Sequence, residues 1–381
     1  MNKILLPILG AIAGDMIGAP YELEGNRIKD IRFPIFSSNS YPTDDTVQTV
    51  AIMKWLALSN NLDKDDLCRI LKSMCLKYPN AGYGHSFKVW LHSNNLSPYN
   101  SFGNGSAMRV ASIALYATSI NDVFDLAKKT AEVTHNHSEG IKGAQAVASA
   151  IYLAYHGFCK NNIKKFIEDK FKYNLDGSIC SIRENYSFNA TCQGGVPQAI
   201  MAFLESVDFE DAIRLAVSLG GDADTQASIS GAIAAAFYKE IPSHILNWVK
   251  RYNIAEFDEI KSKFIESIFM QKEFGHMMCC VTNRDVYMKG IQSYTFACTD
   301  TFNVFVPKGT RLLIDLKEED QSIISCKVLN NKDIITNQFI QDYKVINPNE
   351  IDSLYSLGIC MTKEYFDVID VDLVKTSDLN P

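Results

Sequence analysis

The chain has 381 residues, of which 47% are hydrophobic and 21% are charged. This is an ordinary globular composition, and the length is enough for two domains. The net charge of -7 argues against a protein that binds nucleic acid or anionic lipid through charge alone. The acidity is greatest at the C-terminal end, because residues 281–381 contain 10 Lys and Arg against 15 Asp and Glu.

The ten cysteines show no CxxC spacing, and a chain of this length needs no disulfide framework to be stable. We therefore expect reduced thiols, most of them buried, and a cytoplasmic protein. Residues 4–13 form an apolar run after Lys3 that imitates a short secretory signal. Because the run continues directly into GDMIG (14–18), we interpret residues 3–17 as a buried first helix and expect no association with membranes.

Glu22 is the last residue of the stretch GDMIGAPYE (14–22). We expect the first helix to end in this stretch, in a loop that contains Gly and Pro. By its pattern alone, Glu22 is a solvated loop residue. YPTDDT (41–46) follows, directly before an apolar run that predicts a helix over 44–59. Thr or Asp at this place could simply cap the helix. Two consecutive aspartates exceed that need, since their repulsion must be offset by a cation or by several hydrogen bonds.

Apolar residues recur with helical spacing up to about residue 275, which predicts an all-α domain over 1–278. The predicted helices after 44–59 cover 63–77, 107–118, 121–134, 139–158, 196–206, 209–218, 223–238 and 253–271. GGDADT (220–225) stands at the start of the helix over 223–238 and again places carboxylates at a helix entry. Taken alone, this motif could also be a cap.

The two aspartate motifs together supply four carboxylates and two threonine hydroxyls. Oxygen ligands of this number suit Mg²⁺ or Mn²⁺, whereas zinc would require His or Cys clusters that the sequence lacks. If the motifs converge, they would hold a pair of ions about 3.5–4 Å apart, the arrangement that activates a water for hydrolysis.

After about residue 280 the sequence changes to short β-branched and aromatic runs separated by turn signals. One predicted hairpin joins 302–306 to 311–314, and another joins 322–329 to 334–339. We therefore expect a small β-rich (α+β) domain over 279–381, which binds a target or partner protein. Its acidity makes nucleic acid an improbable partner.

The ordered set of motifs resembles the ADP-ribosylglycohydrolase family, which includes the dinitrogenase reductase-activating glycohydrolase. The matching stretches are GDMIGAPYE (14–22), YPTDDT (41–46), GYGHSFKVWL (82–91), SFGNGSAMRVA (101–111), VTHNHSEG (133–140) and GGDADT (220–225). The resemblance covers roughly residues 5–270 and implies an all-α catalytic domain with two Mg²⁺ ions, Mn²⁺ being an alternative.

The resemblance also implies roles for individual residues. The implied metal ligands are Thr43, Asp44, Asp45, Asp222, Asp224 and Thr225, and the implied catalytic carboxylates are Glu22 and Asp224. The implied substrate contacts are Gly103, Asn104, Gly105, His137, Ser138, Gly194 and Gly195, although the sequence around Gly194 is only loosely like the family's turn. Two roles remain open for Arg109: it could pair with an acidic residue, or it could contact phosphate.

The expected activity is hydrolysis of the glycosidic bond between ADP-ribose and a modified side chain of a protein or small molecule. In this hypothesis the ions bind the 2″ and 3″ hydroxyls of the terminal ribose and polarise a water that attacks its anomeric carbon. The SFGNG segment resembles family members that act on ADP-ribosyl-serine, whereas the VTHNH segment resembles those that act on ADP-ribosyl-arginine. We slightly prefer arginine as the modified residue. The alternatives are a non-catalytic ADP-ribose binder or structural relative, and a metal-dependent nucleotide phosphohydrolase.

Overall fold

The computed structural model describes residues 3–59, 61–274, 277–282, 286–293, 299–306, 311–316, 323–328 and 371–372. The contacts within the chain divide it into two compact units, Met1–Lys272 and Glu273–Pro381. The described residues before 275 contain helices and no strand, apart from one isolated bridge between Gly103 and Thr191. This confirms the prediction of a helical domain.

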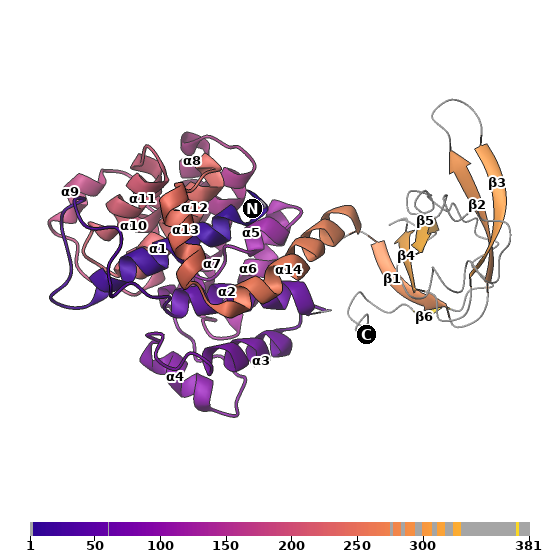
Figure 1. The fold of residues 1–381 in the computed structure, drawn as a ribbon, viewed down its shortest axis with the longest axis horizontal. Helices are drawn as coiled ribbons and strands as arrows, with labels where there is room; N and C mark the ends of the chain where they lie inside the picture. Colours follow the sequence, from indigo (N-terminus) through magenta and orange to yellow (C-terminus); the bar gives the residue numbers. More distant parts are fainter. Residues whose placement is uncertain are drawn as a thin grey trace. The chain divides into compact units, whose positions relative to one another are not determined.

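The helical unit is built in the following order (Figure 1): η1 (Lys3–Leu5), α1 (Leu6–Glu22), α2 (Asp44–Leu58), α3 (Lys64–Cys75), α4 (His85–His92), η2 (Asn104–Ser106), α5 (Ile113–Tyr116), α6 (Ile120–Glu132), α7 (Ser138–Tyr155), α8 (Lys160–Phe171), α9 (Ile179–Arg183), α10 (Cys192–Glu205), α11 (Phe209–Val217), α12 (Ala223–Tyr238), α13 (Ser243–Tyr252) and α14 (Ala255–Phe274).

Several helices differ from those that periodicity predicted. The expected helix over 107–118 is wrong, because the chain forms the short helices η2 and α5 with turns between them. Helix α1 continues through Pro20 and ends at Glu22, since burial along its length outweighs the local preference of Gly and Pro for a loop. Helices α4, α8, α9 and α13 were not predicted.

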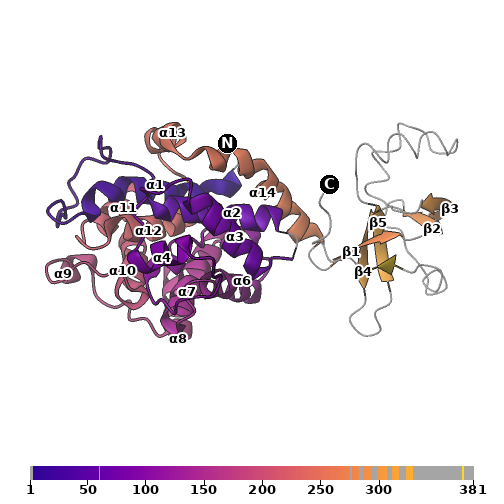
Figure 2. The same cartoon turned by 90° about the horizontal axis from the view of Figure 1, so that it is seen from below.

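The first helix and α12 lie side by side at the centre of the helical unit (Figures 1 and 2). Three glycines spaced four residues apart on α1 make the approach possible. A Cβ atom on Gly10, Gly14 or Gly18 would lie 2.4, 2.0 or 2.4 Å from a backbone oxygen of α12. The two backbones are therefore in direct contact, which brings the C-terminal half of α1 close to the start of α12.

The described part of the chain contains one helical stretch, Lys3–Glu22, that is long and apolar enough to cross a membrane. The other helices pack around it, and 89% of its apolar window is buried inside the protein. This burial is the property of a core helix and agrees with the interpretation of the apolar N-terminal run as a buried first helix. Of the five cysteines with described side chains, Cys68, Cys75 and Cys192 are buried.

Six strands are described in the second unit: β1 (Met277–Thr282), β2 (Val286–Ser293), β3 (Thr299–Val306), β4 (Arg311–Leu316), β5 (Ile323–Val328) and β6 (Val371–Asp372). One sheet has the order β5-β4-β1-β6, and β2 pairs with β3 in another. The predicted hairpin of 302–306 with 311–314 is not formed, because β3 and β4 belong to different sheets. The partner proposed for 322–329, residues 334–339, lies outside the described residues.

Replacement of Gly14 tests the close contact of α1 with α12. We expect Gly14→Ala to lower the free energy of unfolding by about 1–3 kcal/mol, because the added methyl group would overlap the backbone of Ala227. Gly84→Ala is the control, since no atom lies within 4 Å of the added Cβ. Urea denaturation of both variants measures the difference, and equal stability would contradict the contact.

Candidate metal centre

Two helix N-termini form the framework of the site. Thr43 is the N-cap of α2, and Asp44 and Asp45 occupy its first turn. Asp222 is the N-cap of α12, and Asp224 and Thr225 lie in its first turn. Backbone N–H groups and the helix dipole favour negative charge at these positions, which explains why carboxylates are tolerated there.

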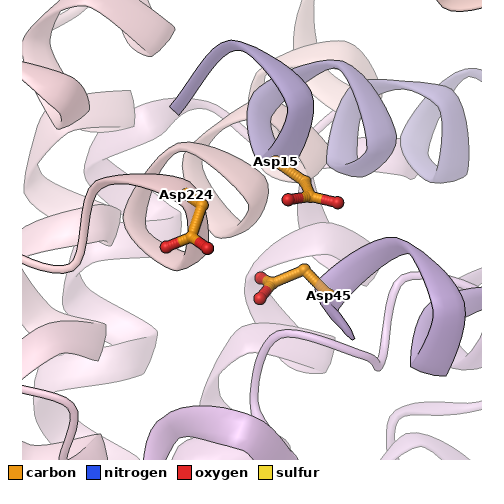
Figure 3. Close-up of side chains that lie close together, drawn as sticks. All are labelled: Asp15, Asp45 and Asp224. Carbon is orange, nitrogen blue, oxygen red and sulfur yellow. The ribbon is translucent and has the colours of Figure 1, made fainter. Parts of the chain in front are cut away.

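The two motifs meet although about 180 residues separate them. Figure 3 shows the carboxylates of Asp15, Asp45 and Asp224 pointing towards a common region from α1, α2 and α12. One carboxylate oxygen from each lies within 4.8 Å of the others, and Glu22, Asp222 and Asp224 form a second such group. The Thr225 hydroxyl also donates to Asp45 Oδ2 at 3.1 Å. Asp224 therefore belongs to both groups.

Asp15, Asp45, Asp222 and Asp224 are buried, and Glu22 and Asp44 are half-buried, without being paired to Lys or Arg among the described residues. None of the ion pairs among the described residues involves Asp15, Glu22, Asp44, Asp45, Asp222 or Asp224. In addition, Asp45 Oδ1 is buried and has no hydrogen-bond partner. Such a cluster is costly for the free protein unless protons or cations neutralise it.

The pKa values reflect this cost. Burial, followed by the charge of neighbouring carboxylates, holds the pKa values of Asp44, Asp45 and Asp224 well above their usual range. Burial also raises the pKa of Asp222 to about 6. The pKa of Glu22 is raised to about 7 by burial first, then by the charges of Asp224 and Asp15.

The motif analysis did not assign a role to Asp15. Its Oδ1 accepts a hydrogen bond from the Thr43 hydroxyl at 2.6 Å, and its Oδ2 accepts from the backbone N–H groups of Thr43 and Thr46 at 2.9 and 3.0 Å. The Thr46 hydroxyl donates to Oδ2 as well. Asp15 thus caps α2 from α1. The one sequence signal was a carboxylate inside an otherwise apolar helix.

Both oxygens of Asp15 are therefore occupied by donors at the start of α2. Because the Thr43 hydroxyl proton points to Asp15, the lone pairs of Thr43 Oγ1 face other groups, one of which is the backbone N–H of Asp45 at 3.3 Å. Asp15 therefore holds the first turn of α2, with Asp44 and Asp45, in place.

A cleft with a volume of about 340 Å³ opens at the carboxylates. Its lining includes Glu22, Asp44, Asp45, Asp222, Asp224 and Thr225, together with Gly103, Asn104 and Gly105. Asn104 connects the two sets, because its Nδ2 donates to Asp222 Oδ2 at 2.7 Å. The glycine loop (Gly103, Asn104 and Gly105) and the acidic cluster (Glu22, Asp44, Asp45, Asp222 and Asp224) therefore share one cavity.

Four predicted substrate contacts are not among the lining residues, and they remain predictions. His137 caps α7 by accepting from the backbone N–H of Glu139, and Ser138 begins that helix. Gly194 and Gly195 lie in the first turn of α10. The Gly194 carbonyl accepts from the Tyr186 hydroxyl at 2.7 Å.

Hydrogen bonds donated by backbone N–H groups hold the glycine loop in place. The N–H of Gly103 donates to Ser101 Oγ at 3.1 Å, and that of Asn104 donates to the Ala190 carbonyl at 2.9 Å. These two N–H groups are occupied within the protein. These two bonds position the loop.

The chain belongs to the ADP-ribosylglycohydrolase family, whose model matches residues 1–273. This finding confirms the resemblance that the motifs indicated.

Among curated proteins, the chain is 26% identical to mouse (Mus musculus) ADP-ribosylhydrolase ARH3, with 69% of this chain and 91% of that protein covered. It is also 26% identical to the human (Homo sapiens) ARH3, covering 69% and 93%. The ADP-ribosylarginine hydrolase Tri1 of Pseudomonas putida is 23% identical, covering 61% and 69%. A solved "ADP-ribosylglycohydrolase-related protein complex" has a TM-score of 0.53 at 24% identity, covering 71% and 98%, and supports the fold.

Thr46→Val tests whether Asp15 fixes the start of α2. The substitution keeps the shape of the side chain but removes one donor to a buried carboxylate, so we expect a loss of about 1.5–3 kcal/mol in unfolding free energy. Thr49→Val is the matched control one turn away, because the hydroxyl of Thr49 makes only a long 3.4 Å bond to a carbonyl. Losses of the same size in both variants would contradict the role of Asp15.

Proposed function

We propose that this protein is a metal-dependent hydrolase that cleaves the glycosidic bond between ADP-ribose and a modified amino-acid side chain and releases ADP-ribose. Membership of the family makes it a hydrolase that acts on ADP-ribose glycosidic linkages. The observation that carries the metal dependence is the cluster of carboxylates from α1, α2 and α12, which have no ion pair with Lys or Arg in the described part of the chain. Five of them, Glu22, Asp44, Asp45, Asp222 and Asp224, line one cleft.

The chemistry of these donors fits a hard divalent cation. Every side chain in the two carboxylate groups offers oxygen, and the buried Asp45 Oδ1 has an unused acceptor site. We propose that Thr43, Asp44 and Asp45 hold Mg²⁺ from one side and that Asp222, Asp224 and Thr225 hold it from the other, with two ions bound and Mn²⁺ as an alternative. When bound, such ions supply Lewis acidity that stabilises negative charge on attacking and sugar oxygens.

Glu22 and Asp224 are the proposed proton acceptors. Both line the cleft, and an oxygen of each lies within 4.8 Å of the other and of Asp222. A carboxylate placed at the edge of such a cluster can accept a proton from an attacking water. The bond from Asn104 to Asp222 Oδ2 restricts rotation of the Asp222 carboxylate and leaves Oδ1 for another partner.

The linkage that is cleaved belongs to this proposal as well. We propose arginine-linked ADP-ribose as the preferred substrate, ahead of serine-linked ADP-ribose. The similarity to a protein named as an ADP-ribosylarginine hydrolase and the VTHNH segment support this order. The SFGNG segment supports the opposite order, so a direct comparison of the two linkages decides it.

A test of the activity uses proteins that are ADP-ribosylated separately on arginine and on serine. We expect release of free ADP-ribose in the presence of Mg²⁺, faster from arginine, and at least a hundredfold slower release after chelation. AMP together with ribose phosphate would instead identify a phosphohydrolase. Binding of ADP-ribose without turnover of either substrate would identify a non-catalytic relative.

Asp44→Ala and Asp224→Ala serve as the loss-of-function variants in this experiment. Each removes a proposed ligand, so we expect release to fall by at least a thousandfold while the helical circular dichroism is retained. Asp125→Ala is the control, because Asp125 is exposed on α6 and does not line the cleft. Full activity in either ligand variant would contradict the assignment.

We also propose that residues 279–381 form a β-rich accessory domain that recognises the modified target. The acidity of residues 281–381 and their position after the family match support a separate role. Deletion of these residues is expected to slow hydrolysis of a modified protein while leaving a small ADP-ribosyl amino acid unaffected. Unchanged turnover of both substrates would contradict target recognition.

A further inference from the structure

Arg109 is a buried cation next to the acidic cleft that contacts neither a carboxylate nor the open cavity. Its side chain is fully buried, and it lies in the turn between η2 and α5. The guanidinium donates to Gln48 Oε1 at 2.8 Å, to the Thr130 carbonyl at 2.6 Å and to Thr134 Oγ1 at 2.8 Å. These partners are all neutral, so neither an ion pair nor a phosphate contact explains the residue.

One branch of this network leads to the acidic cluster. Arg109 Nη1 holds the amide oxygen of Gln48, which fixes the amide so that its Nε2 faces Asp44. Gln48 Nε2 then donates to Asp44 Oδ2 at 2.9 Å. Because a guanidinium can only donate, the orientation of the Gln48 amide is determined and cannot be reversed. The bond restricts the Asp44 carboxylate and leaves its other oxygen for a further partner.

The other branch leads to His135, which also lines the cleft. Thr134 Oγ1 accepts from Arg109 Nη2 and lies 2.8 Å from His135 Nδ1. Since Arg109 supplies a proton to the Thr134 oxygen, the hydroxyl proton of Thr134 is free to point to Nδ1. With the hydroxyl proton in that position, His135 accepts at Nδ1, and a neutral imidazole that accepts at Nδ1 carries its proton on Nε2.

The surroundings of His135 agree with a neutral ring. Burial, and then the charge of Arg109, hold the pKa of His135 well below its usual value. Its ring lines the cleft beside the glycine loop, where a Cβ atom on Gly105 would lie 3.2 Å from Nε2. Nε2 therefore lies beside this loop in the lining of the cleft.

We propose that Arg109 is a positioning residue for two residues that line the cleft: it orients Asp44 through Gln48, and it holds His135 as the Nε2–H tautomer through Thr134. The Asp44 branch rests on the proposed metal-dependent function. The His135 branch depends only on the network and can be tested without metal or substrate.

The tautomer is measured by ¹⁵N NMR of the full chain labelled at histidine, with the His135 signals assigned by their loss in His135→Gln. We expect a pyrrole-type shift at Nε2 and a pyridine-type shift at Nδ1. Thr134→Val removes the donor to Nδ1 and should move both shifts towards a mixture of tautomers, whereas Thr134→Ser should retain the wild-type pattern. A proton on Nδ1 in the wild type, or unchanged shifts in Thr134→Val, would overturn this branch.

The Asp44 branch is measured by calorimetric titration with Mg²⁺. Gln48→Met removes the donor to Asp44 at similar volume, and we expect about tenfold weaker Mg²⁺ binding, the size of one hydrogen bond to a charged group. Gln145→Met is the control, because Gln145 donates to a carbonyl on α6 away from the cleft. The His135 shifts should stay unchanged in Gln48→Met, which separates the two branches.

Arg109→Lys retains the charge but not the planar fork that reaches several acceptors. If it folds, both the Mg²⁺ affinity and the His135 shifts should change together; wild-type values for either would overturn the joint role of Arg109. If it does not fold, the Gln48 and Thr134 variants still decide the two branches. Failure of the wild type to bind Mg²⁺ would overturn the proposed metal centre and the Asp44 branch, while the wild-type His135 spectrum would still decide the tautomer.

Discussion

Mutual repulsion among buried carboxylates is the constraint around which the helical unit is organised. Asp15, Asp45 and Asp224 come from three helices, and one carboxylate oxygen of each lies within 4.8 Å of the others, away from solvent and from basic partners. Such an arrangement is unfavourable by itself. It persists because the surrounding backbone holds the carboxylates in place, and it offers a group of oxygen atoms that could hold a metal ion.

The backbone provides this support in two ways. The glycines of α1 allow its backbone to contact α12, so that Asp15 and Asp224 are neighbours. Asp15 in turn accepts four hydrogen bonds from Thr43 and Thr46, which fixes the start of α2 and the two aspartates that follow. Core packing and the geometry of the site therefore depend on the same contact, and a change in one is expected to alter the other.

Much of this could be predicted from sequence because both ligand motifs stand directly before apolar helical runs. Their residue types specify oxygen ligands, and the structure brings Asp44, Asp45, Asp222 and Asp224 to one cleft as the motifs suggested. Their role as ligands remains a prediction. The roles of Asp15 and Arg109 could not be read from sequence, because their partners are distant in the chain and depend on how the helices pack.

Local patterns failed where tertiary packing decided the outcome. Residues 107–118 have helical spacing, yet Arg109 directs its side chain into the interior and the segment turns around it. Gly194 and Gly195, expected in a turn, belong to the first turn of α10 because Thr191 caps that helix. In the second unit, strand content was predicted but strand pairing was not, since the partner of a strand need not follow it directly in sequence.

The most direct test of the account is anomalous scattering from a crystal of the full chain grown with Mn²⁺. The account predicts two Mn²⁺ peaks in the cleft, with Asp44 and Asp45 on one side and Asp222 and Asp224 on the other, and loss of both peaks in Asp224→Ala. A cleft without anomalous signal at saturating Mn²⁺, or with peaks that contact none of these carboxylates, would contradict it.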